Sequence, residues 1–68
     1  MSAISSKLAK NLKRIRTAKK LSQGAIGRKL NFHRAYISGI EHGKRNPTLA
    51  TIQKLADALG VSADELLK

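Results

Sequence analysis

One segment of the chain, residues 34–42, combines a long cationic side chain with small and polar ones. If the segment is helical, Ala35, Ser38, Gly39 and His42 share the side opposite Ile37 and Ile40, and that outer side is small and polar. Arg34 stands at the start of the helix, and the candidate contact residues are Arg34, Ala35, Ser38 and Gly39. Such a side can lie in the major groove of B-DNA, which is about 12 Å wide and accepts one helix. There an arginine pairs with guanine, an alanine meets the thymine methyl, and a serine reaches a base or a phosphate. A glycine lets the backbone approach closely. A plain phosphate contact is an equally weighted interpretation of Arg34.

Basic residues are concentrated in the first two thirds of the chain. Residues 1–47 contain twelve Lys and Arg and one acidic residue, Glu41, for a net charge of +11 (12 − 1). Residues 48–68 contain two basic and three acidic residues, a net of −1 (2 − 3), so the 68 residues carry +10. A surface with both positive and negative charges would keep the protein equally soluble. This imbalance therefore favours a polyanionic partner, and nucleic acid is the first candidate.

Apolar residues recur at helical spacing along the chain and predict an all-α bundle. The five expected helices span residues 6–19, 22–30, 34–42, 49–59 and 63–67. Residues 6–68 then form a single domain, and residues 1–5 are expected to be a flexible N-terminus. The predicted core consists of Leu8, Leu12, Ile15, Leu21, Ile26, Leu30, Ile37, Ile40, Leu49, Ile52, Leu55, Ala56, Leu59, Val61 and Leu66.

Polar residues and glycines mark the expected helix ends. Ser22 and Thr48 are good N-caps for the second and fourth helices. The run Ser62-Ala63-Asp64-Glu65 has the S-x-x-E pattern of a capping box. Asn31 tolerates the left-handed conformation that a sharp turn after the second helix requires.

The composition argues against several classes of protein. The chain has no cysteine, which removes disulfides and thiolate metal sites, and two histidines alone make a weak metal site. We expect no metal, no cofactor and no small-molecule ligand. The N-terminus lacks the apolar segment of a secretory signal and no run approaches a membrane span, so a cytoplasmic location is expected. Without paired carboxylates, a nucleophile beside a base or a phosphate loop, we expect no enzyme and no catalytic residue.

A series of short motifs resembles the Cro/cI-like (XRE-type) helix-turn-helix DNA-binding domains over about residues 7–67. The motifs are Leu21-Ser22-Gln23, Tyr36-Ile37-Ser38 with Ile40-Glu41, Gly43-Lys44-Arg45-Asn46-Pro47-Thr48-Leu49, and Leu55-Ala56-Asp57-Ala58-Leu59-Gly60-Val61. Residues 36–41, followed by residues 45–49, are most similar to controller proteins of restriction–modification systems. The resemblance implies a lambda-repressor-like fold with its helix-turn-helix at the second and third helices. It also implies a sequence-specific transcription regulator, either a repressor or an autoregulatory controller.

The resemblance assigns phosphate contacts around the third helix. In that family the residue matching Gln23 touches backbone phosphate, and the turn matching residues 44–46 lies along the DNA backbone. The predicted phosphate contacts are Ser22, Gln23, His33, Tyr36, Lys44, Arg45 and Asn46. Helix capping is the favoured interpretation of Ser22, and a half-buried packing role carries equal weight for Tyr36.

Arg16 and Glu41 lie on the apolar stripes of two different helices. The resemblance implies that they form a buried ion pair with a structural role. Three positions depart from the family pattern in the joints between helices. Lys20 stands where a glycine is usual before the second helix, Asn31 stands in place of the turn glycine, and His33 stands where a Ser or Thr usually caps the third helix.

A single helix-turn-helix unit reads few base pairs, so we expect a homodimer on two half-sites about one helical turn (34–36 Å) apart. Two surfaces of +11 would repel, and the dimer contact is therefore predicted in the nearly neutral C-terminal segment. Its candidate residues are Val61, Ala63, Leu66 and Leu67. The alternative is that these residues cover the core of the monomer.

Other functions are compatible with the same sequence. A cationic adaptor of the same fold could bind acidic protein or RNA, and the antitoxin of a toxin–antitoxin pair would carry the same motifs. RNA is less favoured because stacking on single-stranded bases needs exposed aromatic residues, and the chain has only Phe32 and Tyr36. A membrane-surface peptide is disfavoured because tryptophan is absent and the apolar stripes are needed for a core.

Overall fold

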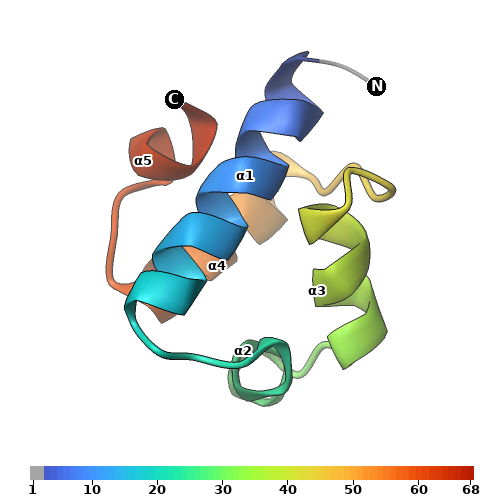
Figure 1. The fold of residues 1–68 in the computed structure, drawn as a ribbon, viewed down its shortest axis with the longest axis vertical. Coiled ribbons are helices and arrows are strands. Elements are labelled where there is room, and N and C mark those ends of the chain that lie inside the picture. Colours follow the sequence, from blue (N-terminus) through green and yellow to red (C-terminus); the bar gives the residue numbers. More distant parts are fainter. Residues whose placement is uncertain (1–2) are drawn as a thin grey trace.

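The computed structural model describes residues 3–68, with side chains from residue 5 onward, and these residues form five helices and no strand (Figure 1). The all-α fold is the predicted one. The helices are α1 (Ala3–Ala18), α2 (Gln23–Leu30), α3 (Arg34–Glu41), α4 (Leu49–Leu59) and α5 (Ala63–Leu67). α1 begins three residues before the expected start at Ser6. Of the N-terminal stretch predicted to be flexible, Met1 and Ser2 lie outside the described residues.

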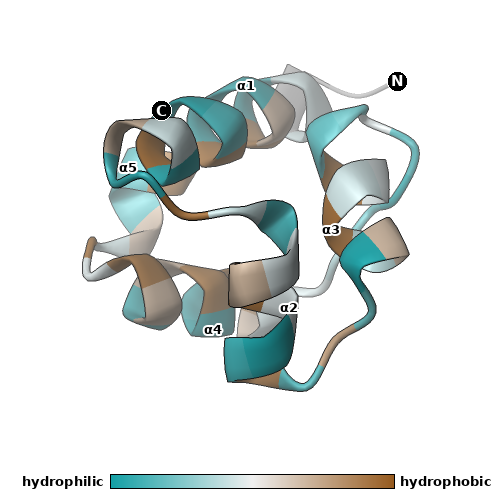
Figure 2. Ribbon diagram, turned by 60° about the horizontal axis from the view of Figure 1, so that its bottom comes forward, coloured by the Kyte–Doolittle hydropathy of each residue, from teal (hydrophilic) through white to brown (hydrophobic). Residues whose placement is uncertain are grey.

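The main contacts between helices connect them in a closed ring. α1 packs on α3 and α5, α2 packs on α3 and α4, and α4 packs on α5. Figure 2 shows hydrophobic and hydrophilic residues alternating along α1 and α4, in keeping with the predicted spacing. Polar contacts also join helices of the ring: Asn11 Nδ2 donates to the Leu66 carbonyl at 3.0 Å, and Lys29 Nζ donates to the Ala58 carbonyl at 3.2 Å.

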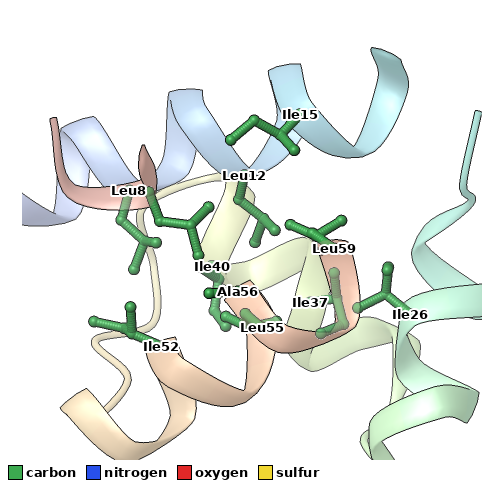
Figure 3. Close-up of a cluster of buried hydrophobic side chains, with 11 residues drawn as sticks. Leu8, Leu12, Ile15, Ile26, Ile37, Ile40, Ile52, Leu55, Ala56 and Leu59 are labelled. Carbon is green, nitrogen blue, oxygen red and sulfur yellow. The ribbon is translucent and has the colours of Figure 1, made fainter. Parts of the chain in front are cut away.

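The core lies inside this ring and is built from aliphatic side chains alone (Figure 3). Its members are Leu8, Leu12, Ile15, Ile26, Ile37, Ile40, Ile52, Leu55, Ala56, Leu59 and Leu66. All eleven belong to the predicted core. Leu21, Leu30 and Val61, which were also predicted, are only partly buried and pack against the cluster from its edge. Ala9 and Ala58 are buried as well, although the prediction omitted them.

Leu49 corrects the core prediction. The helical period places it on the same side as Ile52 and Ala56, but its side chain is 76% exposed. Leu49 is the first residue of α4, and its exposure means that no other element covers this side chain. Periodicity identifies the side of a helix that faces inward but does not show how far the neighbouring elements extend along it.

The predicted N-caps form at two of three helices. Ser22 Oγ accepts a hydrogen bond from the Ala25 amide at 2.9 Å, and Thr48 Oγ1 accepts from the Thr51 amide at 3.2 Å. Ser62 also occupies an N-cap position, but its side chain makes no capping hydrogen bond. The predicted capping box at the start of α5 is therefore wrong, and this short helix is anchored by the buried Leu66 and by its packing on α1 and α4.

The joints use left-handed backbone where the sequence suggested it. Asn31 has φ 60° and ends α2, as expected. Lys20, at the position where the resembled family usually has glycine, also has a positive φ of 59°. α3 ends at Glu41, one residue earlier than predicted, with His42 as its C-cap.

Candidate nucleic-acid interface

The outer side of α3 is open to solvent, while its inner side is anchored in the core. Ile37 and Ile40 are fully buried. Arg34 and Ala35 are exposed, and Ser38 and Gly39 are partly exposed. In Figure 1, α3 lies at the edge of the molecule, flanked by α2 and by the turn that follows it. The four residues predicted to contact bases therefore lie on an accessible helical face.

The turn between α2 and α3 is compact because Gly27 leaves room for it. A Cβ atom at residue 27 would lie 2.7 Å from the Phe32 carbonyl oxygen and 3.5 Å from the Arg34 amide nitrogen. A side chain there would therefore push the start of α3 away from α2. Phe32 and Tyr36 then pack edge to face with their ring centroids 5.3 Å apart, which braces the turn against the first turn of α3. Tyr36 is half-buried, as the packing interpretation of this residue requires.

The basic turn after α3 folds back onto the helix. The Lys44 and Arg45 amides donate to the Gly39 carbonyl at 2.8 and 3.2 Å. Asn46 Oδ1 accepts a hydrogen bond from Ser5 Oγ at 3.4 Å, which links this turn to the start of α1. The side chains of Lys44, Arg45 and Asn46 are exposed, as phosphate contacts must be.

Base-contact and phosphate-contact candidates line one hollow of about 530 Å³ on this face. Its lining residues are Ala35, Ser38, Gly39, His42, Lys44 and Arg45. His42 was not among the predicted contacts, although it follows Ser38 by four residues and so falls on the same helical face. Its Nδ1 lies 2.8 Å from the Ser38 carbonyl oxygen and 3.4 Å from Ser38 Oγ, so its ring is held beside the hollow.

Arg16 and Glu41 form the ion pair that the resemblance implied. Arg16 Nε donates to Glu41 Oε2 at 2.6 Å, and its Nη2 donates to Oε1 at 3.0 Å. The third guanidinium nitrogen, Nη1, donates to the Leu21 carbonyl at 2.7 Å. Only 13% of the Arg16 side chain and 2% of the Glu41 side chain are exposed. The pair ties α1, the joint before α2 and α3 together behind the candidate interface.

Gln23 completes this cluster, which sequence reasoning did not foresee. Its Nε2 donates to Glu41 Oε1 at 3.1 Å, so the amide predicted to touch phosphate is already bonded inside the protein. Burial, the largest single influence, would raise the pKa of Glu41. The hydrogen bonds from Arg16 and Gln23, together with the charges of Arg16 and Lys13, outweigh burial and hold this pKa below its ordinary value. The hydrogen bond to Glu41 likewise raises the pKa of Arg16.

The remaining predicted contacts divide by exposure. His33 is exposed at the N-cap of α3 and makes no capping hydrogen bond, which leaves its ring available to a ligand. Ser22 is exposed too, but its hydroxyl is occupied as the cap of α2.

In the C-terminal segment, three of the predicted dimer residues, Val61, Ala63 and Leu67, are partly buried. Leu66 corrects the dimer prediction, because it is 0% exposed and belongs to the core of the monomer.

Neither a metal site nor a membrane span is found within residues 3–68. Three or more His, Asp or Glu side chains nowhere gather there in a group that could hold a metal ion. None of the described helices is both long and apolar enough to cross a membrane.

Comparison with known proteins identifies a common architecture. A helix-turn-helix family model matches residues 12–66. The HTH-type transcriptional regulator y4dJ of Sinorhizobium fredii is 44% identical over 57 residues, which are 84% of this chain and 74% of that protein.

Solved structures agree with this match over nearly the whole chain. The restriction–modification controller protein C.AhdI from Aeromonas hydrophila is 40% identical and superposes with a TM-score of 0.88, covering 96% of this chain and 98% of that one. The controller protein C.Esp1396I, solved as a tetramer with its natural 35 base-pair operator, is 34% identical with a TM-score of 0.85. That match covers 100% of both chains.

Proposed function

The chain belongs to the helix-turn-helix family, and from this premise we propose that it is a transcription regulator that binds double-stranded DNA sequence-specifically. The observation that carries the proposal is the outer side of α3. Its outward residues Ala35, Ser38 and Gly39 are small, and exposed cations lie around them: Arg34 at the start of the helix, and Lys44 and Arg45 in the turn that folds back over it. An α-helix of this kind fits the major groove, and the flanking cations meet the phosphates on either side.

We assign base contacts to the start and middle of α3. Arg34 would pair with guanine, Ala35 would contact a thymine methyl, and Ser38 would reach a base edge. Gly39 lies beside them on the same face. The proposed phosphate contacts are His33, Tyr36, Lys44, Arg45, Asn46 and the start of α2 at Ser22 and Gln23. At Gln23 the support comes from the N-terminal amides of α2, since its side chain is bonded to Glu41.

We further propose that the chain acts as a homodimer and regulates genes as a controller or repressor. The support is its similarity over full length to C.AhdI and to C.Esp1396I, the latter a tetramer on its operator. A twofold dimer would set two copies of α3 about 34–36 Å apart, one helical turn of DNA. The proposed contact residues are Val61, Ala63 and Leu67. They are apolar and partly exposed, and they belong to the nearly neutral C-terminal segment rather than to the cationic one.

Binding alone accounts for this function, and no chemical step is required of the protein. Relatives of the chain are named as transcription regulators and control proteins. We accordingly propose that the protein is not an enzyme, takes no cofactor and works in the cytoplasm, where the DNA it regulates is found.

The proposal is tested by selecting bound fragments from random duplexes and from the DNA upstream of the gene itself. A selected site should bind about 10³-fold or more tightly than random DNA. Arg34→Ala should weaken binding to that site by about 5- to 150-fold, equivalent to about 1–3 kcal/mol. Arg14→Ala is the matched control, because Arg14 is exposed on α1 and its removal costs the same charge.

Salt dependence separates phosphate contacts from base contacts. Lys44→Ala should weaken binding to all sequences alike and reduce the slope of log K against log salt by about 0.9. Arg34→Ala should instead relax the preference among sequences. If no sequence is enriched, or if acidic protein or RNA binds as tightly as duplex DNA, the chain is a cationic adaptor of the same fold.

A further inference from the structure

Gly39 lies directly beneath the side chain of Arg45. A Cβ atom at residue 39 would lie 2.7 Å from Arg45 Cγ, 3.5 Å from its Nε and 3.7 Å from its Cδ. Real Cβ atoms essentially never approach another carbon within 3.0 Å. The aliphatic part of Arg45 therefore crosses the outer side of α3 at the one position where the helix has no side chain.

The backbone and an aromatic ring hold Arg45 in this path. Its amide donates to the Gly39 carbonyl at 3.2 Å, which fixes the start of the side chain over the helix. Its guanidinium carbon lies 6.0 Å from the centroid of the Tyr36 ring, within the range of a cation–π contact. Tyr36 precedes Gly39 by almost one helical turn, so the charged end of Arg45 points back along α3 toward Ala35 and His33. These residues and Arg45 line a second hollow on the same face.

Two explanations of Gly39 can be compared. A glycine could let the DNA backbone approach α3, or it could make room for a side chain of the protein itself. The distances favour the second, because the space above Gly39 is filled by Arg45 before any DNA arrives. Arg45 is also exposed, so its guanidinium stays available to a ligand while its stem is held.

We propose that Gly39 is a positioning residue that seats Arg45 across α3 and aims its guanidinium at the groove, rather than a residue that contacts DNA. This inference rests on the proposed DNA-binding function. Seating the stem in advance reduces the cost of ordering a long side chain when DNA binds, which is about 0.5–1.5 kcal/mol for each immobilised chain. The size of residue 39 would then decide whether Arg45 contributes to recognition.

A double-mutant cycle on the selected duplex tests the inference. Gly39→Ala should weaken binding by about 2- to 13-fold, the fold-change equivalent of that ordering cost. Arg45→Ala should weaken it more, and G39A combined with R45A should bind no worse than R45A alone. Arg14→Ala again controls for the lost charge. Additive effects of the two changes, or a G39A variant that binds as wild type does, would overturn the inference.

A thermal melt of the variant separates positioning from stability. Alanine is the better helix former by about 0.5–1 kcal/mol, so G39A should melt at or above the wild-type temperature. A melting temperature that falls together with affinity would assign Gly39 a structural role and would overturn its proposed role in positioning Arg45.

A measurement without DNA separates this inference from the proposed function. In NMR spectra, the Tyr36 ring current should shift the Arg45 side-chain resonances, and G39A should abolish that shift. If the wild-type protein shows no such shift, Arg45 is not held over Gly39 beside Tyr36, and the inference fails whatever DNA the protein binds. If the shift is present but no duplex is bound selectively, the proposed function is overturned, and with it the role of the Gly39–Arg45 contact in DNA recognition.

Discussion

Removing the Glu41 carboxylate should unfold the protein far more readily than its position on an eight-residue helix suggests. Glu41 accepts three hydrogen bonds, two from Arg16 at 2.6 and 3.0 Å and one from Gln23 at 3.1 Å. Glu41→Ala leaves the guanidinium of Arg16 mostly buried, with the Leu21 carbonyl as its remaining partner. It also opens a cavity where three segments of the chain meet.

The magnitude follows from burial. Breaking a buried ion pair by removing one partner costs about 3–5 kcal/mol. A domain of 68 residues is stabilised by about 3–10 kcal/mol in total, at roughly 0.05–0.15 kcal/mol per residue. In a domain of this size, each kcal/mol moves the melting temperature by about 4–8 °C. We therefore expect E41A to lower the melting temperature by at least about 12 °C, so that part of the protein is unfolded at 37 °C.

Thermal melts followed by circular dichroism at neutral pH measure this effect. Arg16→Ala should be similarly costly, and R16A combined with E41A should cost much less than the sum, since both changes remove the same interaction. Arg16→Met with Glu41→Leu is the complementary control, because an apolar pair of similar volume often restores the stability lost. A fall of less than about 4 °C in E41A, or additive single changes, would refute the reasoning.

Three further predictions concern stability. Because the pKa of Glu41 is lowered in the folded protein, its contribution should be fully present above its ordinary value of 4.5 and lost as the pH falls through the folded value; the melting temperature of wild type should drop in acid more steeply than that of E41A. Lys20→Gly should raise the melting temperature by a few degrees, because φ at residue 20 is 59° and a side chain in that conformation costs about 1 kcal/mol or more; an unchanged or lower melting temperature would contradict this. Thr48→Ala should cost about 1 kcal/mol in urea denaturation because its hydroxyl caps α4, whereas Ser62→Ala should cost little because Ser62 makes no such bond; equal losses would show that the capping bond is not the cause.

Local regularities of the sequence were enough to predict the elements and the face of α3. The apolar period of about 3.6 residues identifies the side of each helix that faces inward, and Ile37 and Ile40 thereby leave Arg34 and Ala35 outward. Helix ends followed from residue chemistry at Ser22 and Asn31, because capping and left-handed backbone depend on a few neighbouring atoms. The charge imbalance and the motifs around α3 predicted a nucleic-acid partner, because both can be read from the sequence without knowing which distant residues meet.

Features that depend on distant parts of the chain were decided only by the tertiary structure. Leu49 and Leu66 have the same residue type and both lie on apolar stripes, yet one is 76% exposed and the other 0%. The difference is whether another helix covers them, which no local pattern encodes. Likewise, Gln23 bonds to Glu41 and Arg45 lies over Gly39 because the fold brings together segments 18 and 6 residues apart (41 − 23 and 45 − 39). Spacing along the chain predicts which side chains share a helix face, whereas contacts between elements are set by packing of the whole core.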